Sequence, residues 1–545
     1  MRENVDWEVT EKRREFLEEL YPLVNDWTNK FPDYRGIFRP EEIEWLLQES
    51  VESASCDDGK NKLLSLVKFA CRIGYRHQPE VDENGRPLRH RTTPLHRLAR
   101  QQHVPGSQGF IELFEIYDRF DVNYEDAAGF THFHVACKFN CEEAVKKFLE
   151  AGQDPNLRVP TTMDSPLHLA VDGIPDIYDE DTSHDRRNNT VPNRRVTESL
   201  LRGGADPNLV NERGETPLHV ICKRKDNDDL MQRFLAICDE LQVRVQVDVR
   251  DQEGNAPLHL AVRRRRLQLI GALLRAGANP NVANAEGSRP LHLMCQSTFY
   301  NILVMPFLAI CRDIGQTVQI DATDNESRTP LQLAMACISP GVVNLLLDRG
   351  ADLSSFASPS LRHYGGAVEF LHDRVKVAAK ALAVVKSVET RTKYAMKRHE
   401  ALTVMRLFDE CELFRRYEGS NFENRWYDNN EFADRAKEIQ IKPKLTLHDL
   451  VQLRPDKAAK LFTHSNYLVL AALDEYVNIP QEPRELCALH LFETMSKTFF
   501  REWATEPFSE LSDGRFPLEC CLSIIYQLSN ADLYRIVLAA EGYSF

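Results

Sequence analysis

Two short phrases, Thr216-Pro217-Leu218-His219 and Gly204-Ala205-Asp206-Pro207-Asn208, recur along the chain and decide its fold. Variants of the first phrase begin at residues 93, 165, 256, 289 and 329, and a degenerate copy begins at residue 131. Variants of the second phrase begin at residues 152, 277 and 350. The two phrases follow each other in register, so an internal repeat organises the larger part of the chain.

Each phrase has a direct conformational interpretation. The threonine is a good helix N-cap, and the proline suits the first helical turn, where its missing N–H costs nothing. The leucine begins a buried stripe, while the glycine of the second phrase supplies a left-handed helix end before the chain turns outward. One repeat is therefore predicted to be a turn followed by two short antiparallel helices, which must stack on neighbouring repeats to bury its apolar face.

The two phrases together resemble the ankyrin repeat. The leucine positions, with Phe133 in the degenerate copy, are 95, 133, 167, 218, 258, 291 and 331. They are spaced by 38, 34, 51, 40, 33 and 40 residues, against about 33 in ankyrin repeats. The longer steps predict insertions that project as loops, and Phe234-Leu235-Ala236-Ile237-Cys238 returns as Phe307-Leu308-Ala309-Ile310-Cys311, a duplication of a long and a short repeat together. We predict an all-α ankyrin solenoid of at least seven repeats, from Lys62 to Phe356.

Four regions follow from this interpretation. Residues 1–62 are predicted to form an N-terminal helical cap, and residues 63–356 the ankyrin array. Residues 357–440 are predicted to be a long helical capping or linker segment, and residues 441–545 a helical C-terminal region. Between Ala367 and Glu418 there is neither glycine nor proline, so one or two long helices are expected there.

Apolar residues in the third region keep a heptad spacing at Val368, Leu371, Val375, Ala378, Leu382 and Val385. This seam favours a helix that lies against the last repeat and closes the array. The alternative is a dimer that forms through residues 368–388, because a heptad seam can also pair two chains.

The C-terminal sequence Phe516-Pro517-Leu518-Glu519 to Asp532-Leu533 resembles the opening of an F-box. An F-box-like segment that closes an ankyrin array is the PRANK arrangement of poxvirus ankyrin proteins, and the chain resembles related insect proteins, found especially in Hymenoptera. Only about thirty residues remain after Phe516, fewer than a full F-box has, so a last helix is missing or short. The resemblance implies docking to a Skp-type adaptor of a cullin-RING ubiquitin ligase through Phe516, Pro517, Leu518, Glu519, Ile524, Ile525, Leu528 and Leu533; the alternative is a simple packing helix.

The recurring histidines at 96, 134, 168, 219, 259 and 292 are predicted to bind the turn backbone of the next repeat rather than a metal. In successive repeats they are too far apart to share one ion. The sequence has no nucleophile elbow, no phosphate-binding glycine-lysine loop and no zinc half-sites, so we predict no catalytic, cofactor or metal site. Paired carboxylates such as Glu125/Asp126 and Asp228/Asp229 are expected on solvated loops.

The run Arg263-Arg264-Arg265-Arg266 is predicted at the turn between two helices, on the rim of the concave face. It is interpreted as a solvated turn, with a docking patch for an acidic partner and a nuclear-localisation signal as alternatives. The insertion from Asp172 to Arg195 is acidic first and basic after, and is predicted to be a loop whose role the sequence does not define.

Composition restricts the class of protein. The net charge of −14 and a charged fraction of 28% are typical of a globular chain and give little support for nucleic-acid binding. The thirteen cysteines have no Cys-x-x-Cys pair, which predicts reduced thiols in the cytoplasm or nucleus. The charged start predicts no secretory signal, and no apolar run is long enough for a membrane span.

The sequence therefore predicts a protein-binding adaptor, mainly monomeric, that needs no cofactor and no membrane. The first hypothesis is that the concave ankyrin face captures a protein target while the F-box-like segment recruits a ligase. The second is a scaffold or inhibitor that sequesters a signalling or transcription factor, as ankyrin inhibitors of Rel/NF-κB proteins do. The identity of the target cannot be derived, because exposed residues that vary freely determine ankyrin specificity.

Overall fold

The computed structural model describes residues 9–25, 38–53, 57–101, 106–173, 192–224, 228–297, 301–361, 370–414, 430–453 and 455–543, together with Val5, Trp7 and Tyr427. The chain forms two compact units, Met1–Asn279 and Pro280–Phe545. The boundary between them lies inside the predicted array. Residues 174–191, which make up most of the predicted insertion 172–195, lie outside the described residues.

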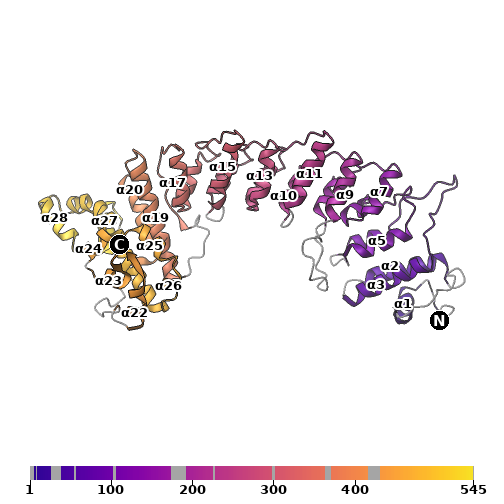
Figure 1. Cartoon of the computed structure of the whole chain (residues 1–545), viewed down its shortest axis with the longest axis horizontal. Coiled ribbons are helices and arrows are strands. Elements are labelled where there is room, and N and C mark those ends of the chain that lie inside the picture. Colours follow the sequence, from indigo (N-terminus) through magenta and orange to yellow (C-terminus); the bar gives the residue numbers. More distant parts are fainter. Residues whose placement is uncertain are drawn as a thin grey trace. The chain divides into compact units, whose positions relative to one another are not determined.

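The N-terminal unit is built from paired helices (Figure 1). Its helices are α1 (Thr10–Asn25), α2 (Pro40–Ser53), α3 (Asp57–Arg72), α4 (Pro94–Ala99), α5 (Gly106–Ile116), α6 (His132–Lys138), α7 (Glu142–Glu150), α8 (Pro166–Asp172), α9 (Pro192–Arg202), α10 (Pro217–Lys223), α11 (Asp228–Glu240), α12 (Pro257–Arg263) and α13 (Leu267–Arg275). From α4 onward, each even-numbered helix begins a repeat and the next helix completes it. Helix α11 has 13 residues where α13 has 9, so part of the 40-residue step is taken up by a longer second helix and not by a loop alone.

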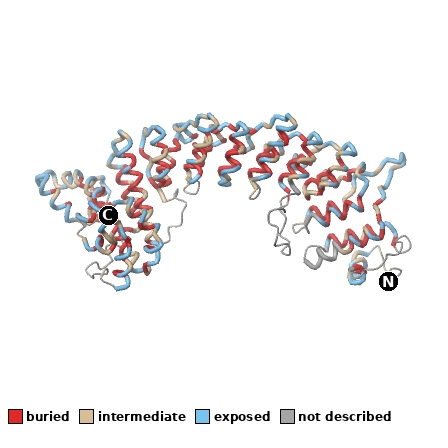
Figure 2. Tube along the Cα trace, in the orientation of Figure 1, coloured by how far each residue is buried: buried red, intermediate tan, exposed pale blue. Residues whose placement is uncertain are grey.

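The repeat helices begin where the recurring phrase predicts. In α10, Thr216 is the N-cap and Pro217 lies at the first helical position. The Leu218 side chain is fully buried, as is Phe133 at the same position of α6. Figure 2 shows the buried residues along the facing sides of the helix pairs. Burial of such a side chain contributes roughly 1.5–3 kcal/mol, so the repeats are stable only as a stack.

The region before the repeats is helical, as expected. Helices α1 and α2 both pack on α3, and α2 also packs on α4, the first helix of the repeats. The predicted boundary at residue 62 falls inside α3, so the cap and the start of the array share one continuous helix.

The C-terminal unit holds two further helix pairs and a larger helical region. Its elements are α14 (Pro290–Cys295), η3 (Asn301–Leu303), α15 (Val304–Asp313), α16 (Pro330–Ala336), α17 (Pro340–Asp348), α19 (Leu371–Arg391), α20 (Arg398–Glu410), α22 (Asn430–Glu438), β1 (Gln440–Lys442), β2 (Leu445–Thr446), α23 (Leu447–Gln452), α24 (Pro455–Leu461), α25 (His464–Leu470), α26 (Asp474–Val477), α27 (Gln481–Leu511), α28 (Leu518–Ile525) and α29 (Asn530–Ala540). With α14/α15 and α16/α17, the described residues contain the seven predicted repeats.

Helix α19 carries the predicted heptad seam and closes the array. It packs on α17, the second helix of the last repeat, and also on α25 and α27. The seam side chains from Leu371 to Val388 are buried within the unit, whereas Val368 lies outside the described residues. The capping interpretation is therefore confirmed. A dimer through residues 368–388 is not supported, because helices of the same chain already cover the described part of the seam.

Two features of the tail were not predicted. Strands β1 and β2 form a short antiparallel hairpin, so the predicted boundary at residue 440 falls on its first strand. Helix α27 is 31 residues long and carries α28 and α29 against its side. None of the described helices is long and apolar enough to cross a membrane.

Candidate protein-binding surfaces

Most of the recurring histidines join consecutive repeats, as predicted, but His96 does not, because its buried Nε2 has no hydrogen-bond partner among the described residues. In each repeat that follows the pattern, the backbone N–H of the N-cap residue donates to Nδ1 of the histidine three residues later. The histidine Nε2 then donates to a backbone carbonyl of the next repeat. These paired distances are 3.1 and 2.8 Å for His134, 3.2 and 2.8 Å for His168, 3.0 and 3.1 Å for His219, and 3.3 and 3.2 Å for His292.

Burial keeps these imidazoles neutral. It lowers the pKa of His134 and His168 to about 4 and also lowers the pKa of His219 and His292. In the resulting tautomer Nδ1 accepts and Nε2–H donates, so neither nitrogen keeps a lone pair for a metal ion. Among the described residues no cluster of potential metal ligands occurs.

The asparagines of the second phrase form a parallel set of links. Asn208 donates from Nδ2 to the carbonyl of Arg244 at 2.9 Å and accepts from the Gln246 N–H at 2.7 Å. Asn281 makes the equivalent pair with Thr317 at 2.8 Å and Gln319 at 2.7 Å. The recurring histidines and asparagines thus form hydrogen bonds between repeats. A partner protein must therefore be recognised by the residues that lie between them in the sequence.

The prediction for Asp126 was wrong. Its side chain is almost fully buried, where a solvated loop was expected. The carboxylate accepts from the backbone N–H groups of Ala128 and Phe130 at 2.8 and 3.0 Å and pairs with Arg100 at 2.5 Å. These donors favour the charged form and lower the pKa of Asp126. Asp229, by contrast, is largely exposed, and the Asp228 side chain lies outside the described residues.

The four-arginine run lies at a turn between two helices, as predicted. Arg263 ends α12, and Arg264–Arg266 form the turn before α13. Arg263, Arg264 and Arg265 are exposed, and Arg266 is half-buried. The Arg263 guanidinium lies 3.5 Å from the Glu253 carboxylate. The run is therefore a basic surface of the N-terminal unit, in which Glu253 offsets part of the charge.

The F-box-like residues divide into an exposed and a buried set. Phe516, Leu518 and Ile524 are 48%, 61% and 37% exposed, and Pro517 and Glu519 are exposed beside them. Ile525 and Leu533 are fully buried, and Leu528 is half-buried. The expectation that all eight residues contact a partner is thus corrected. Ile525 and Leu533 hold α28 and α29 in place, while the first set faces solvent. Tyr526, which the motif did not single out, is 52% exposed next to it.

A buried ion pair fixes the connection between α28 and α29. Lys497 on α27 donates to Glu493 at 2.9 Å and to the carbonyl of Leu528 at 2.6 Å. The N–H of Asn530 donates to the same Glu493 carboxylate at 3.0 Å, and its side chain donates to Ser496 at 2.8 Å. The Lys497 and Glu493 side chains are each 7% exposed. The exposed face of α28 is therefore held in a defined position.

A second buried network, also missed from the sequence, joins the N-terminal cap to the first repeats. The Glu44 carboxylate on α2 lies 2.9 Å from His77 Nδ1 and accepts from the Tyr117 hydroxyl at 3.0 Å. The other His77 nitrogen is 2.9 Å from the hydroxyl of Tyr124. His77 and Arg91 help to keep the pKa of Glu44 below its usual value although burial opposes this. A single His or Glu in an irregular region gives no sequence signal for such a network.

Comparison with known proteins agrees with the repeat geometry. Residues 189–284 and 267–357 match the family model for ankyrin repeats (3 copies). The chain thus contains ankyrin repeats, which are protein-binding modules.

Three relatives illustrate the similarity. A transient receptor potential cation channel, subfamily A member 1, from Homo sapiens is 27% identical over 308 residues, which are 46% of this chain and 27% of that protein. NF-kappa-B inhibitor delta from Mus musculus is 28% identical over 133 residues, 24% of this chain and 38% of the relative. An ankyrin repeat protein of fowlpox virus is 27% identical over 141 residues, 25% and 40% of the two chains. The chain thus spans well under half the length of each.

Proposed function

We propose that the protein is a non-enzymatic adaptor with two binding surfaces, which acts in the cytoplasm or nucleus. The ankyrin repeats capture a protein target on their concave face, to which the arginines Arg263–Arg266 contribute. The segment from Phe516 to Leu533 docks on a Skp-type adaptor of a cullin-RING ubiquitin ligase.

The observation that carries the ligase part is the exposed apolar face of α28. Leu518 and Ile524 face solvent on one short helix, with the exposed Phe516 just before it and Tyr526 directly after it. Single exposed apolar side chains are common on protein surfaces, but several on one element mark an interaction site. Glu519 lies in the first turn of α28, where a carboxylate is favoured by the helix dipole.

The proposed mechanism needs no chemistry from the chain itself. A protein that binds a target at one surface and a ligase at another raises the effective concentration of the target's lysines near the ubiquitin-loaded enzyme. The buried Lys497–Glu493 pair supports this role, because it holds the docking helix rigid and so reduces the entropy lost on binding.

The test uses surface variants of the full chain and a purified Skp-type adaptor. Truncation before Phe516 would also remove the buried Leu533, so Leu518→Lys and Ile524→Lys are the sharper variants. Val469→Lys is the matched control, because Val469 is 65% exposed on α25. In isothermal titration calorimetry, the proposal expects binding by wild type and V469K and a loss of at least about tenfold in L518K/I524K. Equal affinity in all three, or no binding by wild type, refutes it.

The second candidate function is sequestration of a Rel/NF-κB-like transcription factor without ligase recruitment. It is favoured by the similarity to NF-kappa-B inhibitor delta, 28% identity over 133 residues. In this case the chain forms a stable stoichiometric complex with a Rel-homology protein, and the level of that protein does not fall on co-expression. A falling target level that L518K/I524K restores would favour the ligase function instead.

A further inference from the structure

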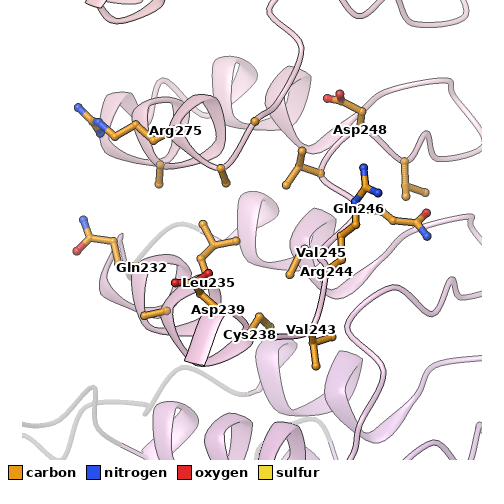
Figure 3. A pocket seen from close by; sticks show the side chains of 16 residues that line it. Gln232, Leu235, Cys238, Asp239, Val243, Arg244, Val245, Gln246, Asp248 and Arg275 are labelled. Carbon is orange, nitrogen blue, oxygen red and sulfur yellow. The ribbon is translucent and has the colours of Figure 1, made fainter. Parts of the chain in front are cut away.

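An open groove of about 1320 Å³ lies on the N-terminal unit, on the side of the second helices of the repeats (Figure 3). One wall is α11, with Leu235 and Asp239, and the opposite wall is the end of α13, with Arg275. The segment 243–249 that follows the long helix α11 closes the groove at its end. The groove thus lies beside the longer second helix of this repeat, α11.

The size of the groove favours a peptide over a small molecule. Pockets for small ligands typically measure about 300–1,000 Å³ and enclose their ligand. This groove is larger, and it is open to solvent. Its lining segment reads Val243-Arg244-Val245-Gln246-Val247-Asp248-Val249, a strict alternation of apolar and polar residues. Residues 243–246 lie outside any helix or turn, whereas Val247 and Asp248 form a turn. The Arg244 carbonyl and the Gln246 N–H are already bound by Asn208, so an extended partner beside residues 243–246 must be held by side-chain contacts.

Two arginines supply the charge that selects the partner. Arg244 and Arg275 are exposed and line the groove from different elements (Figure 3). In the part of the chain that the structure describes, neither guanidinium forms an ion pair. The Asp248 carboxylate accepts from the backbone N–H of Asn279 at 3.1 Å and so serves the fold. Asp239 stands on the α11 wall as the remaining acidic group of the lining.

The repeat that carries the groove has a duplicate 73 residues further along the chain. Comparison of the two copies distinguishes the groove residues that recur from those that do not. Leu235, Cys238, Asp248 and Gly277 recur as Leu308, Cys311, Asp321 and Gly350. Asp321 even repeats the hydrogen bond of Asp248, to the backbone N–H of Asp352 at 2.9 Å.

The charged residues that line the groove, apart from Asp248, do not recur in the duplicate. Arg244 is replaced by Thr317, Arg275 by Asp348 and Asp239 by Arg312. The duplicated repeat folds without the two arginines, so they are available for recognition of a partner.

We propose that this groove binds an extended segment of a partner protein in which acidic side chains alternate with aliphatic ones. The aliphatic side chains pack on Leu235 and Val245, and the carboxylates pair with Arg244 and Arg275. The residues that line this groove include neither Arg263–Arg266 nor any residue of α28, so the proposal does not depend on the ligase function.

The test measures fluorescence anisotropy of labelled ten-residue peptides with the full chain. The probes alternate valine with glutamate or glutamine so that the glutamates are two, four or six residues apart, and the matched controls carry lysine for glutamate. The variant Arg244→Thr/Arg275→Asp introduces the residues that the duplicate already tolerates. Arg213→Thr/Arg349→Asp makes the same net change in charge at exposed arginines outside the groove.

We expect at least one glutamate peptide to bind wild type and R213T/R349D alike, to bind at least about tenfold more weakly to R244T/R275D, and to weaken as salt is raised. The lysine peptides should not bind. The proposal is overturned if no glutamate peptide binds wild type, or if the affinity is equal in the two double variants. Circular dichroism of R244T/R275D verifies that the repeats remain folded.

Discussion

Replacement of Lys497 by methionine tests how the docking helix is held. Lys497 Nζ is bound to the Glu493 carboxylate at 2.9 Å and to the Leu528 carbonyl at 2.6 Å, in a site where both side chains are 7% exposed. Methionine keeps most of the apolar stem but removes the charge. Glu493 is then a buried carboxylate without its counter-ion, and the Leu528 carbonyl loses its donor.

The expected loss follows from these contacts. Breaking one side of a buried ion pair costs about 3–5 kcal/mol, whereas an exposed pair is worth about 0–1 kcal/mol. Lys386→Met is therefore the matched control, because Lys386 is 60% exposed and pairs with Glu389 at 3.3 Å. The double variant Glu493→Gln/Lys497→Met should regain most of the loss, because the amide oxygen can still accept from Asn530 without a buried charge.

The assay is amide hydrogen exchange of α28 and α29, which reports local opening in a protein that need not unfold in one step. We expect exchange to rise about 10²- to 10⁴-fold in K497M and to change little in K386M. Burial raises the pKa of Glu493, and loss of Lys497 raises it further. The folded state then takes up the proton more readily than the unfolded state, so K497M should recover as the pH falls and worsen as it rises. A change below about 1 kcal/mol at pH 7 would refute the reasoning.

Three further predictions concern the repeats. Leu218→Ala should lower the free energy of unfolding of the N-terminal unit by about 2–5 kcal/mol in urea titration, since Leu218 is fully buried; a loss under 1 kcal/mol would contradict close packing at the phrase. His134→Gln should flatten the pH dependence of stability: burial lowers the pKa of His134 to about 4, so wild type loses stability as the pH falls from about 6.5 toward 4, and equal slopes would exclude this cause. Arg224→Met should lower stability by about 1–3 kcal/mol, because its guanidinium binds the carbonyls at the end of α8, that of Val171 at 2.8 Å; an unchanged urea midpoint would show that the contact is not needed.

The repeat fold could be predicted because each phrase specifies its own geometry. Pro217 is tolerated in the first turn of a helix but would disrupt the interior of one. Gly204 follows the end of a helix and has a positive φ of 91°, which glycine adopts without strain. The same holds for His168, whose position three residues after a cap fixes both hydrogen bonds. Local chemistry alone was sufficient for these residues.

The rest depended on contacts between distant segments. The sequence predicted Asp126 to be a surface carboxylate. In the structure its carboxylate is enclosed by Arg100 and by the backbone of its own turn, and neither contact can be inferred from neighbouring residues. The exposed Ile524 and the buried Ile525 are neighbours in sequence, and only packing on α27 decides which one faces solvent. The hairpin β1–β2 is too short to give a period in the sequence.

The most direct test of the central claim is hydrogen exchange of the full chain with and without the purified Skp-type adaptor. The proposal predicts that protection on binding is concentrated at residues 516–528, and that L518K/I524K abolishes it while V469K does not. Protection confined to the repeats, or no protection at residues 516–528 in a complex that does form, would contradict the assignment of α28 as the docking surface.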